Sequence, residues 1–115
     1  MSNSFPPTMY VPDLAGLVSE ITPDSVISRT FYRDDRVKAI LFAFAAGQEL
    51  SEHTAAVPTA LQIISGEAEV TLGEERYDAG PGAWAHMATR LPHSIVAKTP
   101  VVMLLWMFTG GSQQG

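Results

Sequence analysis

Two histidines lie at spacings from glycine that suit a shared binding site. His53 follows Gly47 with five residues between them, in GQELSEHTA, and His93 follows Gly82 in GAWAHMATRLPHS. A neutral imidazole ligates Zn, Fe, Mn, Ni or Cu, and it also serves as a general base near neutral pH. The two rings are forty residues apart, each beside a strand-like segment. We therefore expect them to meet only across a folded β-barrel or sandwich.

The composition limits both the size of this protein and its partners. A chain of 115 residues is expected to form one domain. Its net charge of -5, with 7 basic and 12 acidic residues and no basic run, argues against nucleic acid or a membrane surface as a partner. The absence of cysteine excludes disulfides and thiolate zinc sites. Without a signal-peptide pattern or a membrane-spanning apolar run, the default expectation is a cytoplasmic protein.

Strand-like segments recur at short spacing along most of the chain, with turn residues between them. Six or seven short strands and almost no helix predict an antiparallel all-β sandwich or barrel. The expected strands cover residues 25–32, 37–45, 59–65, 67–72, 83–87, 94–98 and 101–108.

The two ends of the chain are expected to lie outside this barrel domain. We place an N-terminal arm at residues 1–22, the barrel domain at 23–109 and a disordered tail at 110–115. Within the arm, Asp13 is a plausible N-cap for a short helical turn from Leu14 to Val18.

Two of the expected strands are apolar on both faces. Residues 37–45 and 101–108 show no polar alternation, so both of their faces need cover. A single barrel covers only the inner face. We expect a homodimer to cover the outer face, because a large exposed apolar patch is a liability in a monomer. The alternative is that the arm of the same chain, residues 1–22, lies on this surface.

The glycine–histidine pattern resembles the two sequence motifs of the cupin superfamily. The first family motif reads Gly, five residues, His, one residue, His, three or four residues, Glu, six residues, Gly. The second reads Gly, five residues, Pro, one residue, Gly, two residues, His, three residues, Asn. The likeness covers about residues 12–108 and is to small single-domain cupin type-2 proteins, RmlC-like and of mostly unassigned function. It implies a double-stranded β-helix, or jelly-roll barrel. The motif positions that match are Gly47, His53, Gly66, Gly82 and His93.

Several residues of the family's motifs are replaced in this chain. The second histidine of the first motif is Ala55, and its glutamate is Thr59. In the second motif, Ala88, Arg90 and Ala97 stand where the family has Pro, Gly and Asn. Two protein ligands hold a divalent metal poorly, since catalytic sites usually have three. The resemblance therefore implies a degenerate site, in which Zn, Fe, Mn, Ni or Cu is bound weakly or is absent.

Three other polar side chains are candidates for completing the site. His86 shares a strand face with Trp84, and an inward Trp84 would bring His86 into the cavity as a third ligand. The alternative for His86 is a half-buried ring with one backbone hydrogen bond. Gln62 is expected on the outer face by its parity. Thr59 could bind an organic ligand through its hydroxyl, although it is a weak metal ligand.

The expected cavity is largely apolar and suits a small apolar or aromatic molecule. We weigh three functions: a metal-free binder or sensor, a metal-dependent oxygenase or isomerase, and a mainly structural or oligomeric protein. His53 and His93 also have a structural alternative, in which each ring bonds a loop carbonyl. Arg90 is expected in solvent, or at the barrel mouth facing an acidic ligand. The predicted ligand-binding residues are His53, His93, His86, Trp84, Leu61, Ile63 and Met103, and the candidate metal ligands are His53, His93 and His86.

Overall fold

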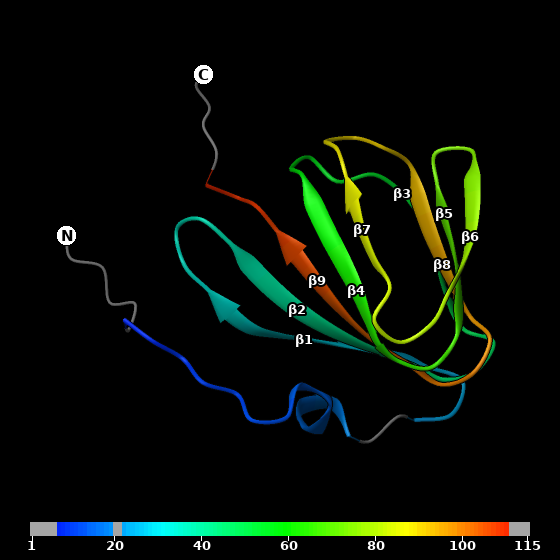
Figure 1. Cartoon of the computed structure of the whole chain (residues 1–115), viewed down its shortest axis with the longest axis horizontal. Helices are drawn as coiled ribbons and strands as arrows, with labels where there is room; N and C mark the ends of the chain where they lie inside the picture. Colours follow the sequence, from blue (N-terminus) through cyan, green and yellow to red (C-terminus); the bar gives the residue numbers. More distant parts are fainter. Residues whose placement is uncertain (1–6, 20–21, 111–115) are drawn as a thin grey trace.

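Two antiparallel sheets face each other in the computed structural model, which describes residues 7–19 and 22–110 (Figure 1). The ends of the predicted arm and tail, residues 1–6 and 111–115, lie outside the described residues. In the five-stranded sheet the order is β1 (Val26–Arg33), β2 (Lys38–Phe44), β9 (Val101–Met107), β4 (Thr59–Ser65) and β7 (Trp84–Met87); in the four-stranded sheet it is β3 (Glu49–His53), β8 (His93–Ala97), β5 (Ala68–Leu72) and β6 (Glu75–Ala79).

This arrangement confirms the predicted all-β jelly-roll fold. All seven expected strands are present, with ends within about two residues of the prediction. Two further strands, β3 and β6, were not expected. In each of them four of the five residues are exposed, so neither has the apolar alternation by which a strand is recognised.

The main core lies between the two sheets. Successive side chains of a strand point to opposite faces, and in β4, β5 and β8 the inward set is mostly fully buried. Phe44, Met87, Ile95 and Met103 are among the largest fully buried side chains. This packing fixes which residues of each strand can reach the interior of the barrel.

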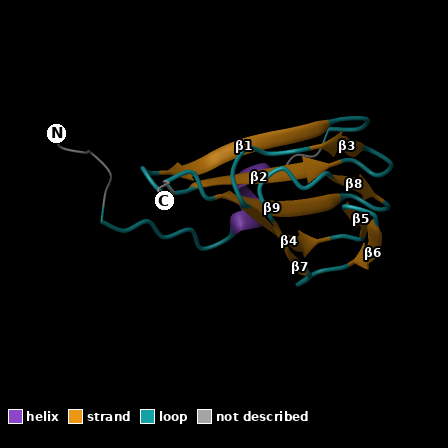
Figure 2. Ribbon diagram, turned by 90° about the horizontal axis from the view of Figure 1, so that it is seen from above, coloured by secondary structure: helices purple, strands orange, loops and turns teal. Residues whose placement is uncertain are grey.

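The outer face of the five-stranded sheet carries a second apolar cluster, which the N-terminal arm covers in part. The 3-10 turn η1 (Leu14–Val18) packs there (Figure 2). Its Val18 is buried in one cluster with Leu41 and Leu104. The predicted helical turn is thus present, although the Asp13 side chain makes no capping hydrogen bond. The arm therefore covers part of this apolar face, which was the alternative to cover by a second subunit. The homodimer stays a prediction. No helix within residues 7–19 and 22–110 is long and apolar enough to cross a membrane.

Candidate functional site at the end of the barrel

His53 and His93 face each other where β3 ends and β8 begins. They are register partners in this antiparallel pair, and their ring centroids are 4.2 Å apart with the planes at 62°. A register shift between Leu50 and His53 adds a residue on β3. Such a bulge re-aims the following side chain, which explains how His53 reaches the face of its partner ring. The structure thus brings together the two rings that the glycine spacing singled out.

Both rings have their Nδ1 atoms fixed by the backbone. The Nδ1 of His53 lies 2.9 Å from the carbonyl oxygen of Ser51, and the Nδ1 of His93 lies 2.9 Å from that of Leu91. A carbonyl oxygen only accepts, so each Nδ1 carries the proton and donates it. In a neutral ring this leaves a lone pair on Nε2, and neither Nε2 has a hydrogen-bond partner among the described residues. The alternative in which each ring bonds a loop carbonyl is therefore correct for the Nδ1 atoms. The Nε2 atoms stay available to a ligand.

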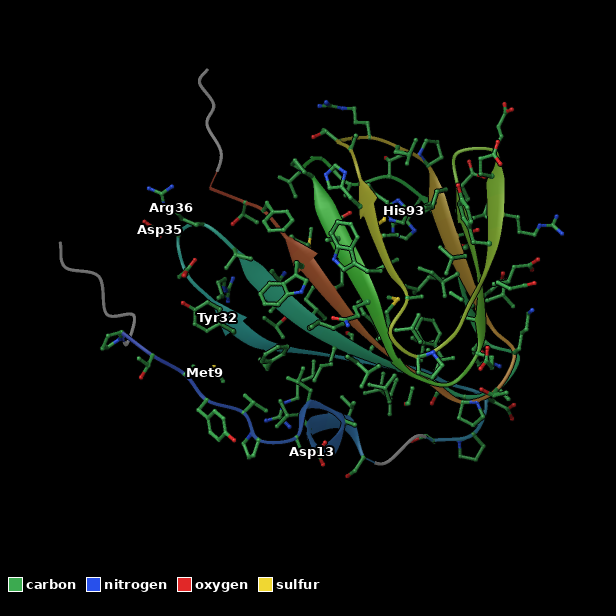
Figure 3. The ribbon with its side chains drawn as sticks, viewed as in Figure 1. Met9, Asp13, Tyr32, Asp35, Arg36 and His93 are labelled. Atoms are coloured by element: carbon green, nitrogen blue, oxygen red, sulfur yellow. The ribbon has the colours of Figure 1, made fainter. Side chains whose placement is uncertain are left out.

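Burial keeps His93 neutral. The residue is only 4% exposed, and Figure 3 shows its ring extending from β8 into the space between the sheets. Burial lowers the pKa of His93 below its ordinary 6.5, and the nearby His53 lowers it further. The bond to the Leu91 carbonyl acts in the opposite direction without overcoming this effect. At neutral pH the Nε2 of His93 is consequently an acceptor rather than a donor.

A third polar group lies at the same end of the barrel. Thr59 opens β4 and is 2% exposed, and its Oγ1 has no hydrogen-bond partner among the described residues. The loops that follow His53 and precede His93 are tied together here by the Arg90 amide, which donates to the Ala55 carbonyl at 2.8 Å. A buried hydroxyl without a partner costs free energy, which marks this position as one that a ligand atom or water would complete.

These residues do not fit a metal centre held by the protein. The described residues contain no group of three or more His, Cys, Asp or Glu side chains placed to hold a metal ion. Ala55 has no donor atom, and the Thr59 hydroxyl is a poor substitute for a carboxylate. The donor set consists of two imidazoles and one neutral hydroxyl.

His86 does not complete the histidine pair. Along β7 the inward side chains are Ala85 and Met87, whereas Trp84 is 63% exposed and His86 is also exposed. The expectation of an inward Trp84, and with it an inward His86, is therefore wrong. Its physical reason is the register with the partner strand: Ala85 pairs with the inward Leu61, so the next residue, Trp84, pairs with Gln62 on the other face. Gln62 pairs with Trp84 on the outer face, as its parity predicted.

A cavity of about 460 Å³ opens between the sheets on the side where β6 and β7 form the two free edges. Of the predicted ligand-binding residues, it is lined by Leu61, Trp84 and His86. Ile63 and Met103 are instead fully buried in the core. The histidine pair is not part of the lining. The full lining is Leu61, Val70, Leu72, Tyr77, Asp78, Ala79, Ala83, Trp84, Ala85 and His86.

Two lining residues, Tyr77 and Asp78, were missed because β6 was not expected as a strand. A signal was present: Gly73 with Glu74 forms the short link between β5 and β6, and glycine after a strand favours a hairpin. Gly73 has a φ of +63°, as such a tight turn requires.

Arg90 occupies a strained backbone position at the end of the barrel near the histidines. Its φ is +66°, in the left-handed region that favours glycine. The cupin motif has glycine at this place, so the substitution keeps the turn and adds strain. The side chain is exposed and forms no ion pair within the described residues.

The solved structures with this fold include several cupins. A cupin superfamily protein from Desulfitobacterium hafniense is 29% identical, with a TM-score of 0.78 over 92% of this chain and 95% of that one. A conserved protein of unknown function from Streptococcus pyogenes is 28% identical, with a TM-score of 0.78 over 97% and 98%. An RmlC-like cupin from Shewanella frigidimarina, 15% identical, shares the fold with a TM-score of 0.71 over 78% and 83%. No protein-family model and no curated protein matches the sequence.

The chain has the cupin fold, as its glycine–histidine motifs predicted, and the solved structures similar to it include cupin superfamily proteins. More narrowly, the chain forms one small barrel and is similar along nearly its whole length to proteins of about the same size. This fold hosts many unrelated activities, so the function must be argued from the site itself.

Proposed function

We propose that this protein binds a small organic molecule carrying a hydroxyl group at the end of the barrel defined by His53, His93 and Thr59. One observation carries the proposal: three side chains at this end have unused hydrogen-bonding capacity, and one of them is a buried hydroxyl with no partner among the described residues. Buried polar groups in folded proteins are normally paired, and exceptions mark functional positions or sites of ordered water.

The chemistry of the three groups defines the ligand. Each neutral imidazole offers an Nε2 acceptor, and the threonine hydroxyl both donates and accepts. A ligand hydroxyl can donate to an imidazole and accept from Thr59 at the same time. Each such hydrogen bond contributes a net stabilisation of about 0.5–1.5 kcal/mol. The neighbouring interior is apolar, with Met87 opposite Thr59 and Leu72 opposite His93 in register, so the remainder of the ligand is expected to be apolar.

Cyclohexanol is a suitable probe, because it has one hydroxyl on an apolar ring. Amide NMR spectra recorded during its addition should show saturable shifts at Thr59 and His93. Thr59→Val should weaken this binding, because it removes the hydroxyl and keeps the shape. Thr71→Val is the matched control, at a half-buried position on the outer face of β5 that pairs with Ser94, and should bind as the unmodified protein does. Equal affinity in all three proteins, or no saturable shift, would contradict the proposal.

A metal-dependent enzyme is the second candidate, favoured by the two free Nε2 atoms on adjoining rings. Elemental analysis of protein purified without a metal-affinity tag separates the two functions. We expect less than stoichiometric metal, since a third protein ligand is lacking. Stoichiometric Fe, Mn, Ni, Cu or Zn that is lost in His53→Ala would favour the enzyme and contradict the metal-free binder.

A further inference from the structure

The cavity between the free edges of β6 and β7 borders the histidine site at Leu72, the register partner of His93, and its lining is otherwise different. Its interior surface comes from both sheets and is aliphatic, with Leu61, Val70 and Leu72 at its floor. Neither His53 nor His93 lines it. Its volume of about 460 Å³ lies within the range of small-molecule sites, which are concave and mostly apolar.

Two exposed aromatic side chains stand at the entrance of this cavity, one from each sheet edge. Tyr77 on β6 is 50% exposed, and Trp84 on β7 is 63% exposed. They belong to the small set of large hydrophobic residues that the described part of the chain leaves exposed. Exposed aromatic groups around an apolar hollow are typical of a binding site rather than of surface that contacts only solvent.

The cavity carries no uncompensated charge at its rim. Asp78 is the acidic residue of the lining, and the Lys98 ammonium donates to it at 2.7 Å. This ion pair lowers the pKa of Asp78 and keeps it ionised. A charged ligand would therefore find no free partner on Asp78, whereas a neutral ring would meet aliphatic surface below and aromatic faces at the entrance.

We propose that this lateral cavity is a second binding site, which takes a neutral, flat aromatic or heteroaromatic molecule between Tyr77 and Trp84. The proposal does not depend on the hydroxyl site at the histidine end. The two sites differ in position and in chemistry: one offers hydrogen bonds, and the other offers apolar area and ring faces.

The chain has two tryptophans, so one can report binding while the other serves as a control in the same spectrum. Quinoline is a suitable probe, because it is flat, neutral at pH 7 and lacks a hydrogen-bond donor. Its addition should shift the indole N–H signal of Trp84 saturably in the millimolar range or below. The indole of Trp106 lies beside the N-terminal arm, outside this cavity, and its N–H signal should not shift.

Variants distinguish the cavity from its surroundings. Ala85→Leu fills the interior and should weaken quinoline binding at least tenfold, whereas Ala88→Leu, three residues on and exposed, should not. Tyr77→Ser, at an exposed position, should weaken binding without loss of the fold. His53→Ala should leave quinoline binding unchanged, which separates this proposal from the hydroxyl site.

Three results with quinoline would overturn the proposal. They are no saturable shift of the Trp84 indole, equal binding by Ala85→Leu and Ala88→Leu, and loss of binding in His53→Ala. Shifts of Trp84 and Tyr77 with protein concentration alone, without quinoline, would assign the cavity to a second copy of the chain and would also overturn it.

Discussion

The buried hydroxyl of Thr59 gives a prediction that runs against the usual effect of mutating a core residue. Thr59→Val keeps the branched shape of the side chain and replaces the hydroxyl by a methyl group. Because Oγ1 has no partner among the described residues, the substitution removes a desolvated polar atom and no hydrogen bond. Burying an unpaired hydroxyl costs about 1–3 kcal/mol in proteins, so we expect the ligand-free variant to be more stable by about 1–2 kcal/mol.

Urea unfolding followed by circular dichroism measures this change, with Thr71→Val as the control. For a chain of this size the gain corresponds to a rise in Tm of roughly 3–10 °C. The control should stay within about 0.5 kcal/mol of the unmodified protein. A loss of stability in Thr59→Val would show that the hydroxyl already has a partner, such as an ordered water, and would refute the reasoning. Cyclohexanol should stabilise the variant less than it stabilises the unmodified protein, because the stability that a bound ligand adds rises with its affinity.

Three further predictions follow from other parts of the structure. Arg90→Gly should raise the free energy of unfolding by about 1 kcal/mol, because φ at this position is +66°; an unchanged or lower value would contradict the strain. Burial lowers the pKa of His93, so the unfolded chain takes up this proton at a higher pH than the folded one. The stability from His93 is therefore complete above pH 6.5 and is lost as the pH falls below it, down to the folded-state pKa. Comparison of unfolding in the unmodified protein and His93→Gln should show this loss only in the former, and parallel curves would contradict it. A homodimer through the outer face of the five-stranded sheet predicts twice the chain mass in sedimentation equilibrium, and the mass of one chain would exclude it.

The fold could be predicted because its signals are local in the sequence. Gly47, Gly66 and Gly82 all have positive φ, so the glycines of the motif mark real turns. The strands β2 and β9, which precede and follow these glycines, bury side chains on both faces, and the sequence shows them as unbroken apolar runs. The strands β3 and β6 could not be recognised in this way, because most of their side chains face solvent.

The site was predictable only in part, because side-chain direction depends on the neighbouring strand. The pairing of His53 with His93 follows from the motif spacing, since both lie at the same end of their sheet. The direction of Trp84 is decided by the register with β4, which places Ala85 beside the inward Leu61 and Trp84 beside Gln62. The sequence of β7 alone does not show this register, so Trp84 was expected to point inward. The cavity beside β6 could likewise not be predicted, because β6 itself was not recognised as a strand in the sequence.

The central claim is that the histidine pair presents two free Nε2 acceptors, beside the Thr59 hydroxyl, to the hydroxyl of an organic ligand. Long-range ¹H–¹⁵N spectra of the imidazole rings test it most directly, because they report the protonation of each ring nitrogen. At neutral pH we expect His93 with its proton on Nδ1, and saturable shifts of the Nε2 signals of both rings as cyclohexanol is added. A proton on Nε2 of His93, or Nε2 signals that do not respond to cyclohexanol, would contradict the account.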